Sequence, residues 1–560
     1  MMVLLVLWLC VLAAVPTTSF QLVAGLPHQN ADVLETKFWQ IATPSSPDYL
    51  KFLTLNDVKN LVGASPDTVA TVSTWFRKIG AEAVAVSPLR DTVTATFHPT
   101  TTFPSNPSNN KFPAHNFTLD YLIRRDPTSK DNAFATPNKK VNAGAGAGGG
   151  TYSIPNQKKA YGIPDTLMAT NDSTLQMVWG PGTFGFSMSQ LEDLKQSEVP
   201  LLNTTRVNFD TANHGQAGGD NYGEGNLDTQ MISSFGLNVH TLVSNTNTSS
   251  STEEGKGFGQ ALLDFVTTLS SRKQLPQVLS LSLGSLNAYS CQLLCDKAVA
   301  KGISMADCNQ YLQQQRQVCM FLSIDQVNRI SSHFKILGAR GVTIFGSSGD
   351  GGSHFSFQPF EGGNVASVLN DISCAYAIPV FPTSSPYVVS VGGTDWSGFF
   401  KPDPTKPKAW SGSGGGFSWQ FPQPSHQQQV VSQYLSLHAK DAGFPSPGSF
   451  NATGRAYPDI AAVAVDGTSQ SSPTVAGIFS LLMDHRLNAG LPPLGFVAPR
   501  LWSVNSQHPG EAFESVTSGN TKTSCDTGFP ASNTGWDAVT GWGRPVWAGI
   551  VKHFGSDANL

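Results

Sequence analysis

The sequence has few charged residues and only one long apolar segment, at its N-terminus. Of its 560 residues, 13% are Asp, Glu, Lys or Arg, and the formal net charge is −4. Because there is no excess of basic residues to neutralise phosphates, the composition argues against nucleic-acid binding. The lack of a second long apolar run argues against a protein with several membrane-spanning helices. Hydrophobic residues still make up 40% of the chain, enough for a large buried core.

The apolar run at the N-terminus has the features of a secretory signal peptide. It reads MMVLLVLWLCVLAAV, and the small residues Thr17, Thr18 and Ser19 follow it closely. The run is shorter than the ~20 residues that a membrane span needs. We therefore expect residues 1–19 to direct the chain into the secretory pathway, to a lysosome-like compartment or out of the cell. We expect no membrane span in the mature protein.

The cysteines and sequons agree with this route. The chain has 7 cysteines, and with Cys10 in the signal an even number remains, which indicates disulfides in a secreted chain. We expect local pairing within residues 286–322, an insertion that holds Cys291, Cys295, Cys308 and Cys319. That leaves Cys374 to pair with Cys525. Zinc is disfavoured because no histidine lies among the four local cysteines. Glycosylation sequons stand at Asn116, Asn171, Asn203, Asn247 and Asn451.

Residues 20–150 are expected to form a small α/β domain followed by a linker. Ser65-Pro66-Asp67 is a typical helix start, and the segments AVAV and TVTATF, after the helix, predict strands. The sequence AGAGAGGG at 143–150 cannot pack a core, so we interpret it as a linker. A compact unit joined through such a linker suggests a removable propeptide.

Residues 151–560 alternate short apolar strands with helices. The strand pattern is clear at 278–283 (VLSLSL), 342–345 (VTIF) and 387–391 (YVVSV). Short apolar strands separated by helices predict an α/β domain whose mostly parallel sheet is covered on both faces.

A candidate nucleophile lies in the segment Gly467-Thr-Ser469-Gln-Ser-Ser-Pro473. A serine that follows Gly-Thr and opens a helix is presented beside free backbone N–H groups and the positive end of the helix. An ordinary helix-capping serine is the structural alternative.

Two carboxylates are the candidate base. Glu224 and Asp228 stand four residues apart at the start of an expected helix, hence on one face of it. If they are buried, such a pair shares a proton, and Asp228 can support Glu224 as the base for Ser469. The alternative is a solvated acidic face. A histidine-dependent mechanism would instead use Asp210 and His214, although the sequence around His214 does not have the usual helical pattern.

A third carboxylate follows the strand VTIF in the loop Gly346-Ser-Ser-Gly-Asp350. Active sites of α/β proteins form at this end of parallel strands. Asp350 could stabilise an oxyanion only when protonated, because an ionised carboxylate cannot donate a hydrogen bond. The alternative is an aspartate in a glycine-rich turn.

Taken together, these motifs resemble the sedolisin family of serine-carboxyl peptidases over nearly the whole chain. The motifs are E-x-x-x-D at Glu224, S-S-G-D at Asp350 and G-T-S-x-S-x-P at Ser469. Further similar segments are FPTSSPYVVSVGGT (381–394), SGGGFSWQFPQPS (413–425) and GWDAVTGWGRP (535–545), and SPDTVATVSTWFRKIGAEA (65–83) in the propeptide region.

The resemblance implies a subtilisin-like α/β catalytic domain behind a small α/β propeptide domain. It implies a Ser469–Glu224–Asp228 triad, with Asp350 in the oxyanion hole. The substrates would be peptides and unfolded proteins, cleaved in acid after the chain's own propeptide has been removed. Release of tripeptides from free N-termini is expected, with internal cleavage on the same fold as the alternative. A catalytically silent binding protein is the alternative from another class.

The resemblance also implies one calcium ion in the C-terminal part of residues 151–560. Its expected ligands are Ser515, Val516, Asn533, Gly535 and Asp537. Ser515 stands where the family has an aspartate, so the site lacks one carboxylate and calcium should bind more weakly, unless Glu514 compensates.

Overall fold

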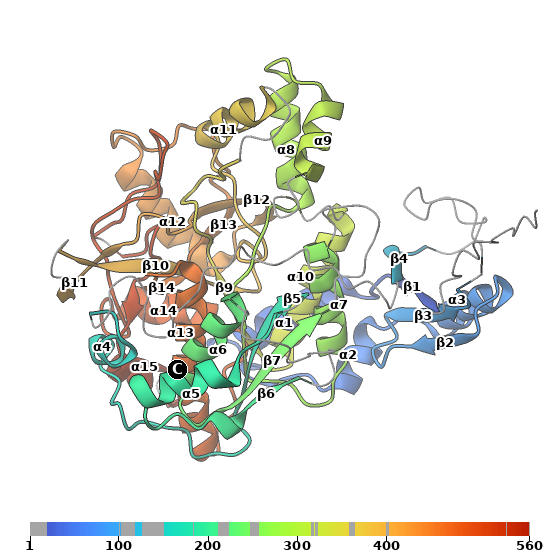
Figure 1. Cartoon of the computed structure of the whole chain (residues 1–560), viewed down its shortest axis with the longest axis horizontal. Coiled ribbons are helices and arrows are strands. Elements are labelled where there is room, and N and C mark those ends of the chain that lie inside the picture. The colour runs from blue at the N-terminus through green and yellow to red at the C-terminus, as the bar shows by residue number, and fades with distance from the viewer. Residues whose placement is uncertain are drawn as a thin grey trace, which may run out of the picture.

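The N-terminal part of the chain forms an antiparallel sheet of four strands in the order β2-β3-β1-β4 (Figure 1). The computed structural model describes residues 19–99, 101, 118–125, 151–182, 184–210, 223–246, 257–314, 319, 323–357, 364–398, 403–533 and 535–558. The predicted signal lies almost wholly outside these ranges. The strands are β1 (Phe20–Gly25), β2 (Ala83–Val86), β3 (Thr92–Phe97) and β4 (Tyr121–Arg125).

Helix α3 (Pro66–Lys78) covers one face of this small sheet. Ser65 caps the helix by accepting a hydrogen bond from the Thr68 N–H group, as the sequence predicted. Val72 and Phe76 of α3 pack against alternate residues of β1 and β3, among them Leu22. The intervening residue Val23 faces the other way, into the core of the large domain. The remaining helices of this part are α1 (Ala31–Ala42) and α2 (Leu55–Val62).

The large domain is built on a sheet of eight strands. Seven of them follow the order β11-β10-β9-β8-β5-β7-β6, and β14 also pairs with β10. Every pairing is parallel except β10 with β11, which confirms the predicted mostly parallel sheet. The strands are β5 (Leu175–Pro181), β6 (Val207–Phe209), β7 (His240–Thr246), β8 (Val278–Leu281), β9 (Thr343–Ser347), β10 (Val389–Ser397), β11 (Asp403–Ala409) and β14 (Ile460–Val463).

Helices cover both faces of the central sheet. On one face α6 (Gly223–Phe235) and α13 (Thr468–Asn488) pack on strand residues such as Phe345. On the other face α7 (Gly257–Ser270) and α10 (Ile324–Ala339) pack on residues such as Ile344. The N-terminal sheet packs on the outer sides of α7 and α10 and lies beside them in Figure 1.

A second group of contacts joins α1 and α2 to α10. Ile336 of α10 is buried in a cluster with Leu34, Val58, Val62 and Leu89 of the N-terminal part. The ring of Phe38 also contacts those of Tyr387 and Phe496 in the large domain. The docking surface of the N-terminal part is therefore apolar over much of its area.

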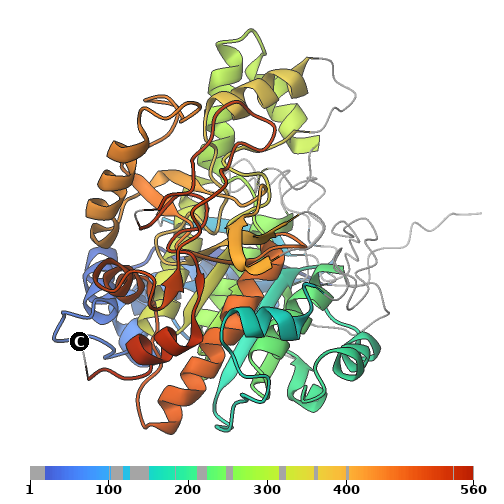
Figure 2. The same ribbon diagram turned by 90° about the vertical axis from the view of Figure 1, so that its left-hand side faces the viewer.

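The other elements extend the domain at its edges, as Figure 2 shows from a second side. The disulfides Cys291–Cys319 and Cys295–Cys308 link the 286–322 insertion internally, and Cys374–Cys525 is the third, as predicted. In the described residues no helix is long and apolar enough to cross a membrane. These elements are α4 (Ile154–Ala160), α5 (Met188–Ser197), α8 (Ala288–Val299), α9 (Met305–Gln314), α11 (Val365–Ala375), α12 (Ser425–His438), α14 (Ala498–Gln507), α15 (Trp547–Phe554), β12 (Gly416–Pro422), β13 (Gly454–Tyr457), β15 (Phe513–Glu514) and β16 (Arg544–Pro545).

Candidate active site

Ser469 is the second residue of α13, and its position depends on the glycine before the helix. Gly467 caps α13 with φ of 87°, a conformation that other residues rarely adopt. The turn places Ser469 at the positive N-terminal end of the helix. Its hydroxyl donates to the carbonyl of Ser282, which follows β8, over 3.3 Å. Ser469 therefore lies in the first turn of a helix, as the motif predicted, at the carboxyl end of the parallel sheet.

Helix α6 brings Glu224 and Asp228 to the same place. The helix begins at Gly223, so the two carboxylates are one turn apart on it, as their spacing predicted. Close packing against α13 fixes this placement, because a Cβ atom at Gly477 would lie 2.7 Å from the Ile232 carbonyl. At the N-terminal end of α6, a Cβ atom at Gly225 would lie 2.0 Å from the Gly185 carbonyl. Glycine at both positions allows α6 and α13 to pack closely, so that the carboxylates of α6 lie near Ser469 of α13.

Burial dominates the electrostatics of the carboxylate pair. It raises the pKa of Glu224 to about 7, and the charge of Asp350 acts in the same direction, while the Ser469 hydroxyl lowers it. Burial and the neighbouring Glu224 raise the pKa of Asp228 well above its usual range. Within the described residues, both oxygens of Asp228 and Oε1 of Glu224 are buried without a hydrogen bond. The Ser282 hydroxyl lowers the pKa of Asp228, but less than burial and Glu224 raise it. A pair in this state retains a proton in weak acid.

Asp350 follows β9 and is held by the start of α13. Its Oδ1 accepts hydrogen bonds from the Thr468 N–H and hydroxyl groups, both over 2.8 Å. The Thr468 hydroxyl also accepts a hydrogen bond from the Gly349 N–H group over 3.1 Å. A Cβ atom at position 467 would lie 2.6 Å from Oδ2 of Asp350, so the glycine also makes room for this carboxyl. The structure thus brings all four predicted catalytic residues together.

Sequence reasoning missed two residues that position this site. Ser282 exchanges hydrogen bonds with Ser469, since its own hydroxyl donates to the Ser469 carbonyl over 3.3 Å. Thr468 connects the nucleophile's helix to the Asp350 loop. Ser282 carries a signal that was available, because it directly follows an apolar strand, as the Asp350 loop does. Nothing in the sequence distinguishes the role of Thr468 from that of a helix cap.

The histidine alternative is only partly within the described residues. Asp210 is buried at the end of β6, where it accepts hydrogen bonds from Ser244 over 3.1 Å and from Arg272 over 2.8 Å. Its carboxylate is thus paired with a guanidinium. His214 lies outside the described residues, so the alternative stays a prediction that mutagenesis must test.

The predicted calcium ligands fit the ion poorly. Asp537 would supply the carboxylate, but its oxygens already accept hydrogen bonds from Ser532, Val539 and Thr540 of its own loop. Glu514, the suggested substitute, is held by Arg544 over 2.6 Å. Calcium prefers six to eight oxygens, several of them charged, and here Ser515 adds no charge. The remaining expected ligands are Val516, Asn533 and Gly535. The ion stays a prediction, and no chemistry below depends on it.

Comparison with known proteins gives three findings. Residues 8–101 match the model of the Pro-kumamolisin activation domain. Tripeptidyl-peptidase 1 of Homo sapiens is 30% identical over 600 residues, covering 97% of this chain and 93% of the relative, and that of Mus musculus is 28% identical over 592 residues, covering 96% and 92%. Among solved structures, Pseudomonas sedolisin, a serine-carboxyl proteinase complexed with pseudo-iodotyrostatin, is 23% identical with a TM-score of 0.46 and covers 72% of this chain and 98% of its own.

Proposed function

Because the chain belongs to the sedolisin family and is a serine-type peptidase made as a zymogen, we propose that it cleaves peptides with Ser469, Glu224, Asp228 and Asp350. One observation carries this proposal. Three carboxyl groups and one serine, from separate parts of the chain, lie together where the parallel sheet meets the N-terminal ends of α6 and α13. A half-buried serine beside carboxyl groups that retain a proton is the arrangement that nucleophilic catalysis with a carboxylate base requires.

The proposed reaction begins with attack of Ser469 Oγ on the peptide carbonyl carbon. Glu224 accepts the hydroxyl proton, and Asp228, which keeps its own proton, supports the negative charge on Glu224. Asp350 in its protonated form donates a hydrogen bond to the developing oxyanion. Glu224 then returns the proton to the leaving amine, and water hydrolyses the acyl-enzyme by the same steps in reverse.

The proposed chemistry operates in acid because of Asp350. An ionised Asp350 cannot donate a hydrogen bond to an oxyanion, so its proposed role requires the protonated carboxyl. Because burial and the neighbouring Glu224 raise the pKa of Asp228, the pair keeps one proton on Asp228 while Glu224 carries the charge that accepts the Ser469 proton. We infer that the compartment is acidic, reached through the secretory pathway by way of residues 1–19.

The substrate proposal is narrower than the family assignment. We propose that the enzyme releases tripeptides from free N-termini, because the relatives that cover nearly its whole length are named tripeptidyl-peptidase 1. Internal cleavage is the outcome that would replace this part of the proposal.

The test compares the wild-type chain with Ser469→Ala between pH 3 and pH 8. Each protein is incubated with an unblocked peptide of ten or more residues and with its N-acetylated form, and mass spectrometry identifies the products. Tripeptide ladders from the unblocked peptide alone, in acid and only with wild-type protein, support the proposal. Internal fragments from both peptides would show an endopeptidase. Cleavage by Ser469→Ala, or none by wild type after removal of the propeptide, would overturn the catalytic assignment. The variant His214→Ala should retain activity.

A further inference from the structure

The loop that carries Asp350 ends in a buried histidine, His354, which takes no part in the proposed catalytic chemistry. Only 6% of this residue is exposed. The loop before it is rich in glycine, and Gly349 and Gly352 have φ of 104° and 68°. Because glycine has little conformational preference of its own, the course of this loop depends on the contacts that hold it.

Both ring nitrogens of His354 face backbone carbonyl oxygens. Nδ1 lies 2.8 Å from the Ser373 carbonyl in the last turn of α11, and Nε2 lies 2.7 Å from the Thr527 carbonyl. A carbonyl oxygen can only accept a hydrogen bond, so each contact requires a proton on the ring nitrogen. Since only the imidazolium has both protons, the ring in this position carries a positive charge. Both distances are typical of hydrogen bonds from a charged donor.

Neither neutral form of the ring satisfies both contacts. Without its Nδ1 proton, the nitrogen would present a lone pair to the Ser373 oxygen, and without its Nε2 proton it would do so to the Thr527 oxygen. The Ser353 hydroxyl, 3.2 Å from Nε2, cannot remove this second repulsion because the carbonyl stays in place. The Ser373 carbonyl also belongs to the negative end of α11, which favours a cation.

The two acceptors are tied to each other. The disulfide Cys374–Cys525 joins α11 to the segment 519–530, beside Ser373 at one end and two residues from Thr527 at the other. The Thr527 hydroxyl also donates to the Cys374 carbonyl over 3.2 Å. Loss of one histidine hydrogen bond therefore shifts the ring and its loop more readily than it separates the two acceptors.

A tight turn connects His354 to Asp350. The His354 N–H group donates to the Gly351 carbonyl over 3.3 Å, so the turn begins one residue after Asp350. A Cβ atom at Gly351 would lie 2.5 Å from the His354 carbonyl, which shows how closely the turn is packed. Displacement of His354 therefore moves the backbone beside Asp350, whose carboxyl is held on its other side by Thr468.

The charged side chains on the surrounding elements do not contact the ring. They are Asp350 in the same loop, Asp371 of α11, Lys297 of α8, and Lys522 and Asp526 in the segment 519–530. In the parts of the chain that the structure describes, none of them forms a hydrogen bond or ion pair with His354. Asp371 and Asp526 are exposed, and the Lys297 ammonium lies over the Tyr376 ring. The two carbonyls thus decide which form of the ring fits.

We infer that His354 is a positioning residue for the proposed reaction: as an imidazolium it joins the Asp350 loop to the Ser373 and Thr527 carbonyls and so fixes the place of Asp350. The inference rests on the role proposed for Asp350 in the oxyanion hole. Histidine changes its charge between neutral and weakly acidic pH. At neutral pH the ring loses one of its two hydrogen bonds, and the loop is held less firmly whatever the state of Asp350.

The test compares kcat and KM of wild type and His354→Gln, both freed of the propeptide, on an unblocked peptide from pH 4 to pH 7. Glutamine is neutral and does not titrate. We expect kcat of the variant to be about 10- to 100-fold lower at pH 4 with little change in KM, because an oxyanion donor acts on the transition state. The ratio of the two kcat values should shrink as the pH rises to 7, since wild-type His354 loses its charge. Titration of Asp350 affects both proteins and cancels in the ratio.

His240→Gln, at the start of β7, is the matched control and should behave as wild type does at every pH. A kcat ratio for His354→Gln that is the same from pH 4 to pH 7 would overturn the inference, because a packing role alone does not depend on pH.

If His354→Gln does not fold, nuclear magnetic resonance of full-length Ser469→Ala with ¹⁵N-labelled histidine decides. The ring N–H protons of His354 are identified by their nuclear Overhauser contacts to Ser373 and Thr527. Two such protons at pH 5 support the inference, and only one would overturn it. Failure of the proposed function is recognised separately, as peptide cleavage by the Ser469→Ala protein.

Discussion

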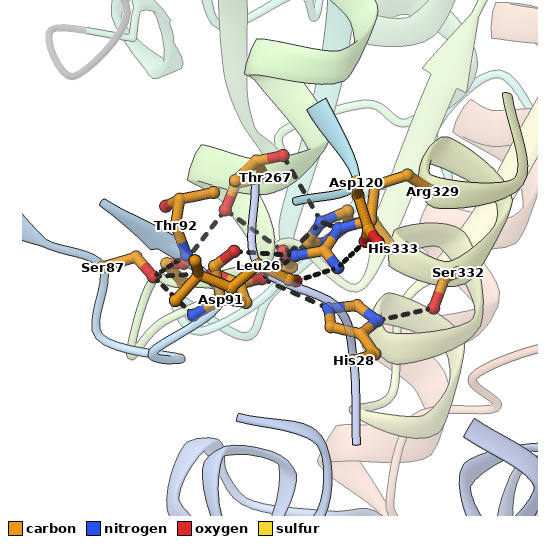
Figure 3. Close-up of polar contacts among 12 residues, drawn as sticks. Leu26, His28, Ser87, Asp91, Thr92, Asp120, Thr267, Arg329, Ser332 and His333 are labelled. Atoms are coloured by element: carbon orange, nitrogen blue, oxygen red, sulfur yellow. Dashed lines mark hydrogen bonds and ion pairs between the residues drawn. The ribbon is translucent and has the colours of Figure 1, made fainter. Parts of the chain in front are cut away.

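Two buried groups of ionisable side chains, one in the active site and one where the N-terminal domain contacts α10 (Figure 3), respond to burial in opposite ways. Glu224 and Asp228 have raised pKa values, because burial and their mutual repulsion disfavour the charged forms. Asp91 is just as deeply buried, yet its pKa is lowered, since His28 and Arg329 lie against it. A carboxylate pair buried without a nearby positive charge keeps a proton that can be transferred. A carboxylate buried beside an arginine stays ionised and forms an ion pair that joins the two domains.

The largest effect is expected when the proposed proton acceptor, Glu224, is removed from the active-site carboxylate pair. Glu224→Gln keeps the shape of the side chain but cannot accept the Ser469 proton. We expect peptide cleavage at the optimal pH to fall by about 10²- to 10⁴-fold. Steady-state kinetics on protein freed of its propeptide measures this, with Glu192→Gln in α5 as the control. Unchanged cleavage would remove Glu224 from the proposed triad.

The next effect concerns an unpaired charge at the interface between the N-terminal domain and α10, where Arg329 pairs with Asp91. Arg329→Met leaves Asp91 buried without its guanidinium, which should weaken docking by about 3–5 kcal/mol. The propeptide domain should then lose protection against exchange and proteolysis even at pH 7. The exposed Arg77→Met in α3 should change neither. If Arg329→Met stays docked at neutral pH, the ion pair between Arg329 and Asp91 contributes little to the interface.

A smaller effect concerns stability near the active site. Because the pKa of Asp228 is raised in the folded protein, its burial destabilises the fold increasingly as the pH rises above its ordinary value. Asp228→Asn should therefore raise the free energy of unfolding at pH 8 by about 1–3 kcal/mol, with little gain at pH 4. Urea unfolding at both pH values measures this, with the exposed Asp193→Asn as the control. An equal effect at both pH values would contradict the assigned cause.

The smallest effect is expected at a third buried carboxylate. Burial raises the pKa of Asp537 to about 7, but N–H groups of its own loop surround it. Because the donor set fits calcium poorly, chelation with EDTA at pH 6 should shift Tm by less than about 2 °C. A larger shift that added calcium reverses would show that the loop holds the ion after all.

The sequence predicted local features well and contacts between distant segments poorly. The active-site residues could be predicted because each is marked by a pattern only a few residues long. These patterns are the spacing of Glu224 and Asp228, the glycine before Ser469 and the apolar strand before Asp350. The interface between the two domains has no such signature, since Asp91 contacts Arg329 and His333 only because the domains dock. A buried histidine on an amphipathic helix such as α10 looks the same whether a second domain covers it or not. For the same reason, the sequence does not show which buried carboxylates have a positive charge beside them, and so it does not predict the direction of their pKa shifts.

The apolar docking surface of the N-terminal domain has a consequence for the solubility of the active enzyme. While the propeptide is attached, Leu34 and Val58 cover Ile336, and Phe38 covers Tyr387 and Phe496. Its departure uncovers these large-domain side chains together. The mature peptidase therefore exposes an apolar patch that its precursor covers, and loss of the propeptide makes the molecule more prone to associate.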